Sequence, residues 1–359
     1  MIVDDSLTVR TIFKRMVESD SGMEVIATAS SAERAIAQLD TTQLDVILLD
    51  LEMPGMGGLE ALPKLLKGAD GAQVLVVSSL TQDGAEHTIS ALSMGAADTM
   101  LKPRPGGFNE EYRSQLLGKI RALGEGTQDR DVDEAQPPVA QNTTAPARAR
   151  PSPVPGAPVL SKAPEVVAIG ASTGGIHALS IMLRCLTRDF DLPILITQHL
   201  PPSFIPVFAR QVEMACARPA VIADEGTEIR RGEVAIATGH GHMTVRRRGD
   251  RLITRTLTDP APSGCLPSVD PMFASLAEAC EGRVLGVVLS GMGRDGLEGA
   301  RALVEAGGTI FAQDAESSAV WGMPGAVANA GLTSLIASPQ EIGENVLKAA
   351  LSVAASERG

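Results

Sequence analysis

The chain has 359 residues and a net charge of -12 at pH 7, from 31 basic and 43 acidic side chains. This length exceeds what one hydrophobic core usually supports, so we expect two domains. The negative charge argues against nucleic acid as a partner, because nucleic acid requires a positive surface. No apolar run approaches the ~20 residues that span a bilayer, and no basic segment followed by an apolar stretch opens the chain. We therefore expect a cytoplasmic protein without membrane insertion.

Cysteines and histidines give no metal pattern in the sequence. His240 and His242 lie two apart, but no cysteine or carboxylate cluster completes a site, so we expect ordinary loop histidines. The cysteines are far apart and never form a C-x-x-C pair, so we expect buried reduced thiols rather than a disulfide framework or a zinc site. There are four of them: Cys185, Cys216, Cys265 and Cys280.

The first third of the chain alternates apolar runs with segments of helical period. This alternation predicts an α/β domain whose parallel sheet is covered by helices on both faces, with a site at the carboxyl ends of the strands. The first run has three residues before an acidic pair, whereas strands usually have ~5–6. We therefore expect that the true start lies upstream or that this domain is less stable than similar ones. The apolar runs are Ile2–Val3, Val25–Ala27, Val46–Leu49, Val74–Val77 and Thr99–Leu101.

Polar side chains follow these runs, where strand ends meet at one edge of the sheet. Clustered carboxylates repel one another unless a cation neutralises them, and their hard oxygen ligands suit Mg²⁺. A magnesium ion and a lysine could then stabilise a phosphoryl group carried on one carboxylate. The residues concerned are Asp4, Asp5, Asp50, Ser78 and Lys102.

Four segments resemble the receiver domain of two-component systems, which has a doubly wound, flavodoxin-like sheet: Asp4-Asp5-Ser6, Leu49-Asp50-Leu51-Glu52-Met53-Pro54-Gly55-Met56, Ser78-Ser79 and Lys102-Pro103. The resemblance implies that Asp50 accepts the phosphoryl group and that Ser78 and Lys102 contact it. It also implies that Mg²⁺ is held by Asp4, Asp5, Asp50 and the main-chain carbonyl of Glu52. Many receivers carry a switching aromatic three positions before the lysine. Thr99 stands there in this chain, so we do not expect an aromatic switch.

A change of composition divides the chain. From residue 124 to residue 163 the apolar periodicity stops, and Pro, Ala, Thr, Gln and Asp predominate. Such a composition is typical of a linker that is extended where it is rich in proline. We therefore predict a first domain at 1–123, a linker at 124–163 and a second domain at 164–359.

The second domain again alternates apolar runs with helical segments, which predicts an α/β fold with a mostly parallel sheet. Its first run leads into Gly170-Ala-Ser-Thr-Gly-Gly175, a pattern typical of a strand, a tight turn and a helix start. A serine in that turn suits either a nucleophile or a phosphate cradle. The lysine of a phosphate-binding loop is absent, since Ile176 follows, so nucleotide binding is disfavoured. The runs are Val166–Ile169, Ile194–Ile196, Val234–Ile236, Val284–Leu289 and Thr309–Phe311.

Three polar residues after these runs have the chemistry of a serine hydrolase. A serine hydroxyl needs an imidazole to remove its proton, and the imidazole works best when a carboxylate fixes its tautomer. Ser172, His199 and Asp295 could supply these roles. Gly170 to Gly174 matches G-x-S-x-G, but the order Ser, His, Asp differs from that of α/β-hydrolases, so we do not expect that fold.

Taken together, the two halves resemble the protein-glutamate methylesterases of bacterial chemotaxis over essentially the whole chain. The resemblance implies that Ser172 is the nucleophile, His199 the base and Asp295 the orienting acid. It places Thr173 in the active site and the backbone N–H of Met292 in the oxyanion hole. The motifs are Gly170–Gly175, Gln198-His199-Leu-Pro201, His242-Met243, Pro267-Ser-Val-Asp270, Ser290-Gly-Met-Gly-Arg-Asp295-Gly296, Ala312-Gln-Asp314 and Gly322-Met-Pro324.

This resemblance implies hydrolysis of glutamate γ-methyl esters on methyl-accepting chemoreceptors, with deamidation of receptor glutamines as a second activity and no cofactor in the catalytic domain. A histidine kinase would phosphorylate Asp50 and release a receiver that covers the active site, a change that Trp321 could report. Two alternatives stay open. The chain could be a receiver-gated binding module that holds a ligand without turnover, or it could act mainly as a deamidase.

Overall fold

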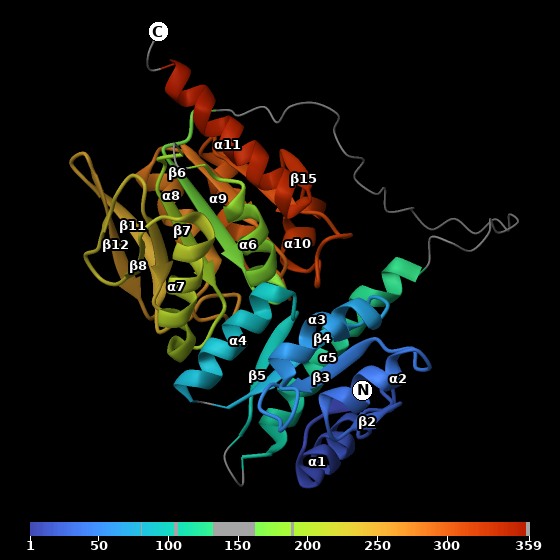
Figure 1. The fold of residues 1–359 in the computed structure, drawn as a ribbon. Helices are drawn as coiled ribbons and strands as arrows, with labels where there is room; N and C mark the ends of the chain where they lie inside the picture. Colours follow the sequence, from blue (N-terminus) through green and yellow to red (C-terminus); the bar gives the residue numbers. More distant parts are fainter. Residues whose placement is uncertain (80, 104–106, 132–161, 188–189, 357–359) are drawn as a thin grey trace, which may run out of the picture.

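The computed structural model describes residues 1–79, 81–103, 107–131, 162–187 and 190–356, which form two α/β units in contact with each other (Figure 1). In the first unit, a parallel sheet has the strand order β2-β1-β3-β4-β5. This is the order of flavodoxin-like folds, as the sequence predicted. The strands are β1 (Ile2–Val3), β2 (Thr28–Ala29), β3 (Val46–Asp50), β4 (Gln73–Ser78) and β5 (Asp98–Leu101), and the helices are α1 (Leu7–Val17), α2 (Ala32–Leu39), α3 (Gly58–Gly68), α4 (Gln82–Met94) and α5 (Glu110–Asp131).

The second strand does not lie where the apolar run predicted it. The run 25–27 precedes the strand, and β2 begins at Thr28, which pairs with Ile2. Pairing with the short β1 fixes this register, since Val3 pairs with Ala29 and no further residue of β1 is available. The connection from β2 to α2 ends at a helix N-cap. The Ser31 hydroxyl accepts a hydrogen bond from the N–H of Arg34 at the start of α2.

The last helix of the first unit runs beyond the predicted domain end at residue 123. α5 continues to Asp131, so residues 124–131 of the predicted linker are helical. This segment, Gly-Glu-Gly-Thr-Gln-Asp-Arg-Asp, has little apolar periodicity, which is why the sequence did not indicate a helix there. Most of the predicted linker, 132–161, lies outside the described residues, and the boundaries 1–123, 124–163 and 164–359 remain predictions.

The second unit is built on a seven-stranded sheet with the order β15-β14-β13-β6-β7-β10-β8, parallel throughout. Its central strands are buried on both faces, which explains their continuous apolar sequences. The edge strands β8 and β15 were not predicted. The strands are β6 (Val166–Ala171), β7 (Ile194–Gln198), β8 (Ala220–Ala223), β10 (Val234–Ala237), β13 (Val284–Val288), β14 (Thr309–Gln313) and β15 (Leu335–Ala337).

Helices cover both faces of this sheet (Figure 1). None of the helices within the described ranges is long and apolar enough to cross a membrane. They are α6 (Gly175–Arg184), the short 3₁₀ helix η2 (Pro202–Phe204), α7 (Ile205–Cys216), α8 (Val269–Ala279), α9 (Leu297–Glu305), α10 (Met323–Asn329) and α11 (Pro339–Ser356).

A small antiparallel sheet, not predicted from the sequence, packs beside α8. It consists of β9 (Glu228–Ile229), β11 (His242–Arg248) and β12 (Arg251–Leu257). His242 begins β11 and is 2 % exposed, so the expectation of a loop histidine was wrong for this residue. The sequence did not predict these strands because they contain many polar residues and are joined by a short connection. Arginines weaken the alternation of apolar and polar residues that indicates a strand. All four cysteines are free, but only Cys216 and Cys280 are fully buried.

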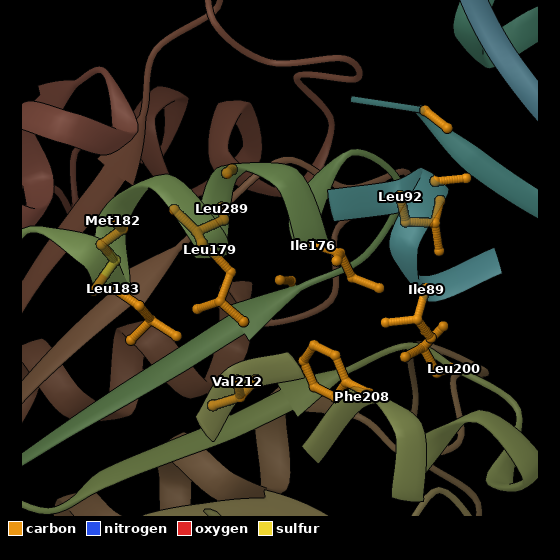
Figure 2. Close-up of a cluster of buried hydrophobic side chains, with 14 of the residues drawn as sticks. Ile89, Leu92, Ile176, Leu179, Met182, Leu183, Leu200, Phe208, Val212 and Leu289 are labelled. Atoms are coloured by element: carbon orange, nitrogen blue, oxygen red, sulfur yellow. The ribbon is translucent and has the colours of Figure 1, made fainter. Parts of the chain in front are cut away.

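Helix α4 of the first unit lies between the two sheets and contacts α6 and α7 of the second (Figure 1). Ile89 and Leu92 of α4 belong to the same buried apolar cluster as Ile176 and Leu200 (Figure 2). Burial of apolar surface stabilises such a contact by about 25 cal/mol per Å². The two units therefore share a hydrophobic interface beside the end of β6.

Candidate functional site

The polar residues of the first unit meet at the carboxyl ends of its strands. Asp50 ends β3 and Lys102 directly follows β5, which brings Lys102 Nζ to 2.6 Å from Asp50 Oδ2 and 3.0 Å from Asp4 Oδ2. Carboxylate oxygens of Asp4, Asp5 and Asp50 lie within 4.8 Å of one another. Asp4 and Asp50 are each 1 % exposed, whereas Asp5 is exposed.

This carboxylate cluster has unsatisfied groups. Burial raises the pKa of Asp50 to about 6, although the hydrogen bond and charge of Lys102 oppose that shift. Among the described residues, Asp4 Oδ2 is buried and shares the Lys102 ammonium with Asp50, and Ser78 Oγ, which ends β4, is buried with no hydrogen-bond partner. A hard cation would satisfy such oxygens, so the donor set fits Mg²⁺. The N–H of Glu52 donates to Asp50 Oδ1 over 3.0 Å, and the role of its carbonyl stays a prediction.

In the second unit, a tight turn fixes Ser172 at the end of β6. The N–H of Ser172 donates to the carbonyl of Ser290 over 3.0 Å, and Ser172 accepts from the N–H of Gly175 over 2.8 Å. Gly174 has φ +76°, and a Cβ atom there would lie 2.6 Å from the Cβ of Ala319. The turn therefore requires glycine at this position, both for its backbone conformation and for its close packing.

The three residues expected to form a hydrolase triad come together at this turn. Ser172 Oγ lies 3.1 Å from His199 Nδ1, and His199 Nε2 lies 2.8 Å from Asp295 Oδ2. His199 directly follows β7, which pairs with β6, and Asp295 follows β13 on the other side of β6. Here Nδ1 faces the serine and Nε2 faces the aspartate. A chymotrypsin-type triad has the opposite arrangement, with Nε2 toward the serine.

The electrostatics of this cluster hold a proton on the imidazole. Burial lowers the pKa of His199, but hydrogen bonds with Asp295 and Cys265 outweigh it and raise the pKa to about 9. For Asp295, burial raises the pKa, while the hydrogen bonds of His199, Ser268 and Val269 outweigh that effect and hold it well below its usual range. Asp295 is thus a carboxylate, and His199 is a base that becomes neutral only at alkaline pH.

Three residues whose roles the sequence did not reveal hold Asp295 in place, two directly and one through Ser268. Ser268 Oγ donates to Asp295 Oδ1 over 2.6 Å, and the N–H of Val269 donates to Oδ2 over 2.7 Å. His242 fixes Ser268 in turn, because its Nδ1 accepts from the N–H of Ser268 and its Nε2 donates to the carbonyl of Asp259. All three residues lie within the motifs Pro267-Ser-Val-Asp270 and His242-Met243, and this was the only sign of their importance in the sequence.

The two further residues expected in the active site differ in their surroundings. Met292 follows Gly291, whose backbone lies against Ser172, because a Cβ atom on Gly291 would be 2.8 Å from Ser172 Cβ. Its side chain is 48 % exposed, and the oxyanion role of its N–H stays a prediction. Thr173 is buried, and its hydroxyl donates to Asp98 Oδ2 of the first unit over 2.6 Å.

The first unit closes directly over this turn. The N–H of Gly174 donates to the carbonyl of Ala97 over 2.5 Å, next to the bond between Thr173 and Asp98. Lys119 of α5 also pairs with Asp98. The hydroxyl of Thr173 and the N–H of Gly174 lie beside Ser172. They are therefore occupied by the first unit, the hydroxyl by the Asp98 carboxylate of β5 and the N–H by the carbonyl of Ala97.

Known protein families match both units of the chain. Residues 1–107 match the response regulator receiver domain, and residues 167–346 match the family described as CheB methylesterase. A protein-glutamate methylesterase/protein-glutamine glutaminase of Rhodospirillum rubrum is 39 % identical over 98 % of this chain and 94 % of its own length. One of Caulobacter vibrioides is 43 % identical over 99 % of both chains.

A solved structure covers the second unit. The CheB methylesterase catalytic domain of Thermotoga maritima matches 52 % of this chain and 98 % of its own, with 30 % identity and a TM-score of 0.50. The sequence relatives extend this similarity over both units and the segment between them. The chain therefore belongs to the protein-glutamate methylesterase family, in which a receiver domain precedes a CheB methylesterase domain.

Proposed function

We propose that this protein is a phosphorylation-activated hydrolase of glutamate γ-methyl esters on methyl-accepting chemoreceptors, which it converts to glutamate and methanol during chemotactic adaptation. The observation that carries the proposal is the hydrogen-bonded series from Ser172 through His199 to Asp295. The names of the relatives give the substrate class.

In the first half of the reaction, Ser172 Oγ attacks the ester carbonyl while His199 Nδ1 accepts its proton. The N–H on Nε2 faces Asp295, whose charge stabilises the imidazolium that forms. Backbone N–H groups of the turn, with that of Met292 among them, hold the oxyanion. His199 then gives its proton to the leaving methoxide, and methanol departs from an acyl-enzyme on Ser172.

In the second half, His199 takes a proton from water as the water attacks the acyl-enzyme, and it gives this proton to Ser172 Oγ as the glutamate side chain is released. Water is the only co-reactant of these steps. Deamidation of a receptor glutamine follows the same path with ammonia as the leaving group, and the glutaminase activity in the relatives' names favours it as a second activity. A protein that acts mainly as a deamidase would differ only in which substrate it converts faster.

Regulation follows from the contact between the two domains. A histidine kinase would transfer a phosphoryl group to Asp50, where Ser78 and Lys102 contact its oxygens. Asp4, Asp5, Asp50 and the main-chain carbonyl of Glu52 would hold Mg²⁺. When bound, this ion neutralises charge on the phosphoryl group. We infer a cytoplasmic location, because the kinases and the modified helices of chemoreceptors lie there.

In the unphosphorylated state, the receiver would inhibit the enzyme by occupying substrate-binding donors. The Asp98 carboxylate on Thr173 and the Ala97 carbonyl on Gly174 offer the two oxygen groups that a glutamyl ester also offers. Phosphorylation would move β5 and α4 away, which frees these donors. These contacts exist in the closed state and are lost in the open state. A charge change at Asp50 that weakens them would therefore shift the equilibrium toward the open state.

A serine-directed acylating probe tests the catalytic proposal against the alternative of a binding module. We expect the probe to label Ser172, and we expect the His199→Ala variant to lose this labelling because its serine is not activated. Methanol release from methylated receptor membranes then tests the substrate. Labelling that survives without His199, together with absence of methanol, would favour a module that binds without turnover.

A further inference from the structure

Cys265 lies at the catalytic centre, although the reaction does not require it. One ligand atom each of His199, Cys265 and Asp295 lie within 4.8 Å of one another. The loop that carries Cys265 joins β12 to α8 and is held at the site by Ser268, which donates to Asp295. The Cys265 residue is partly exposed and the His199 side chain is 17 % exposed, so solutes can reach these two ligands, whereas the Asp295 side chain is buried.

We propose that Cys265, His199 and Asp295 form a binding site for a soft divalent metal ion such as Zn²⁺, and that its occupation inhibits the hydrolase. Thiolate, imidazole and carboxylate are the three ligand types that Zn²⁺ prefers. In a tetrahedral site the ligand atoms lie about 3.5 Å apart. Small side-chain rotations therefore convert the observed cluster into three protein ligands with a fourth position for water.

The surroundings of Cys265 and Asp295 favour coordination of a metal ion by both residues. Asp295 keeps hydrogen bonds from Ser268 and Val269 when its bond to His199 is lost, so the carboxylate stays oriented. Among the described residues, Cys265 Sγ makes a long contact of 3.9 Å with the carbonyl of Ser263 and interacts with His199. On binding, Cys265 supplies a thiolate and His199 a neutral imidazole, so the protons on these two groups are released to solvent, and the thiolate and the Asp295 carboxylate neutralise the double charge of the ion.

A bound metal ion would inhibit the hydrolase because it coordinates His199, the general base of the reaction. Coordination through Nδ1 removes the lone pair that accepts the proton of Ser172, and coordination through Nε2 breaks the bond to Asp295. Either mode stops the first half of the reaction. The site is inhibitory and not a cofactor site, and this part of the inference rests on the proposed function.

Two measurements on the full-length chain test the site, with Cys265→Ala as the variant and Cys185→Ala as its matched control. Cys185 is also partly exposed, but its Sγ donates to carbonyls of Ile181 and Gln340, away from the centre. Cd²⁺ titration follows the ultraviolet charge-transfer band of a cadmium thiolate. Methanol release is followed against Zn²⁺ in buffer with Mg²⁺, which prefers oxygen ligands and leaves thiolates free.

We expect a saturable cadmium band in the wild type and in Cys185→Ala that is lost in Cys265→Ala. The Zn²⁺ concentration for half-inhibition, measured relative to each variant's own metal-free rate, should rise roughly tenfold or more in Cys265→Ala alone. Unchanged Zn²⁺ sensitivity or an unchanged cadmium band in Cys265→Ala would overturn the site. If the wild type releases no methanol, the proposed function fails, and the cadmium band still decides whether the metal binds.

Discussion

The two domains place their functional groups alike, at the carboxyl ends of parallel strands, but leave them in opposite states. In the receiver, Ser78 Oγ is buried with no hydrogen-bond partner among the described residues, Asp4 Oδ2 shares the Lys102 ammonium with Asp50, and burial raises the pKa of Asp50 to about 6. In the catalytic domain, both oxygens of Asp295 accept hydrogen bonds, and its pKa is held low. Buried polar groups are costly when unpaired. The receiver site is therefore built to gain ligands, whereas the triad is complete before substrate arrives.

The contact between the domains links these two states. Asp98 belongs to β5, the strand that Lys102 follows, and its carboxylate reaches Thr173 beside the nucleophile. A rearrangement around Lys102 thus has a short path to the active site.

The largest effect is expected from Ser172→Ala. Removal of the nucleophile should lower methanol release by about 10⁴-fold or more, because the acyl-enzyme cannot form. Incorporation of phosphoryl at Asp50 should stay unchanged, since that site lies in the other domain. Activity retained by the variant would remove Ser172 from the mechanism.

Support of Asp295 should matter next. Ser268→Ala removes a hydrogen bond to a charged group, worth about 1.5–3 kcal/mol, and should reduce kcat roughly 10- to 100-fold. The matched control is Ser263→Ala, because the Ser263 hydroxyl lies 3.2 Å from Ser268 Oγ and is not a partner of Asp295 in the described contacts. Because Ser263 reaches Asp295 only through Ser268 in these contacts, its variant should lose less activity, and equal losses in both variants would contradict a specific role of the bond from Ser268 to Asp295.

The link between domains should respond to Asp98→Ala. Loss of the carboxylate from Thr173 removes a charge-assisted hydrogen bond, so the unphosphorylated protein should gain activity by about tenfold. Glu86→Ala is the control, because Glu86 pairs with Arg210 across the same interface but is exposed, and such pairs contribute at most about 1 kcal/mol. If both variants keep the basal rate of the wild type, Asp98 does not hold the closed state.

The pH dependence should report on His199. Its pKa is raised to about 9, and only the neutral imidazole accepts a proton, so kcat/KM should rise with pH up to about 9. The charged imidazole also stabilises the folded state, and this contribution is full below about pH 6.5 and is lost as pH rises through about 9. Cys265→Ala should move the midpoint of the rate profile to lower pH. A rate that falls between pH 6 and pH 8 would contradict this assignment.

The smallest effect is expected in fluorescence. Trp321 Nε1 donates to the carbonyl of Gln313, and the preceding Val320 belongs to an apolar cluster with receiver residues. Release of the receiver should therefore change Trp321 emission modestly when a phosphoryl donor and Mg²⁺ are added. An Asp50→Asn variant provides the control, and a full signal in that variant would show that the donor acts elsewhere.

The sequence predicted both parallel sheets because their central strands are buried on both faces and read as continuous apolar runs. It misplaced β2 and missed β8, β9, β11, β12 and β15, since edge strands and arginine-rich strands have no such pattern. Ser172, His199 and Asp295 could be predicted because each follows a strand that the apolar runs identified.

Contacts between distant segments could not be predicted in this way. Ser268 and His242 lie in recognisable motifs, but only the fold brings them behind Asp295. Cys265 forms no C-x-x-C pair, so the sequence indicated no metal ligands, whereas the structure places it beside His199. The contacts of Asp98 with Thr173 depend on how two domains dock, which no local pattern encodes.

The central claim is that Asp50 governs hydrolysis at Ser172. Its most direct test is the rate of methanol release from methylated receptor membranes, measured with and without a small-molecule phosphoryl donor, for the wild type and for Asp50→Asn. We predict that the donor raises the rate of the wild type severalfold and leaves that of Asp50→Asn at the basal value. A wild-type rate that does not respond to the donor, while Asp50 becomes phosphorylated, would contradict the account.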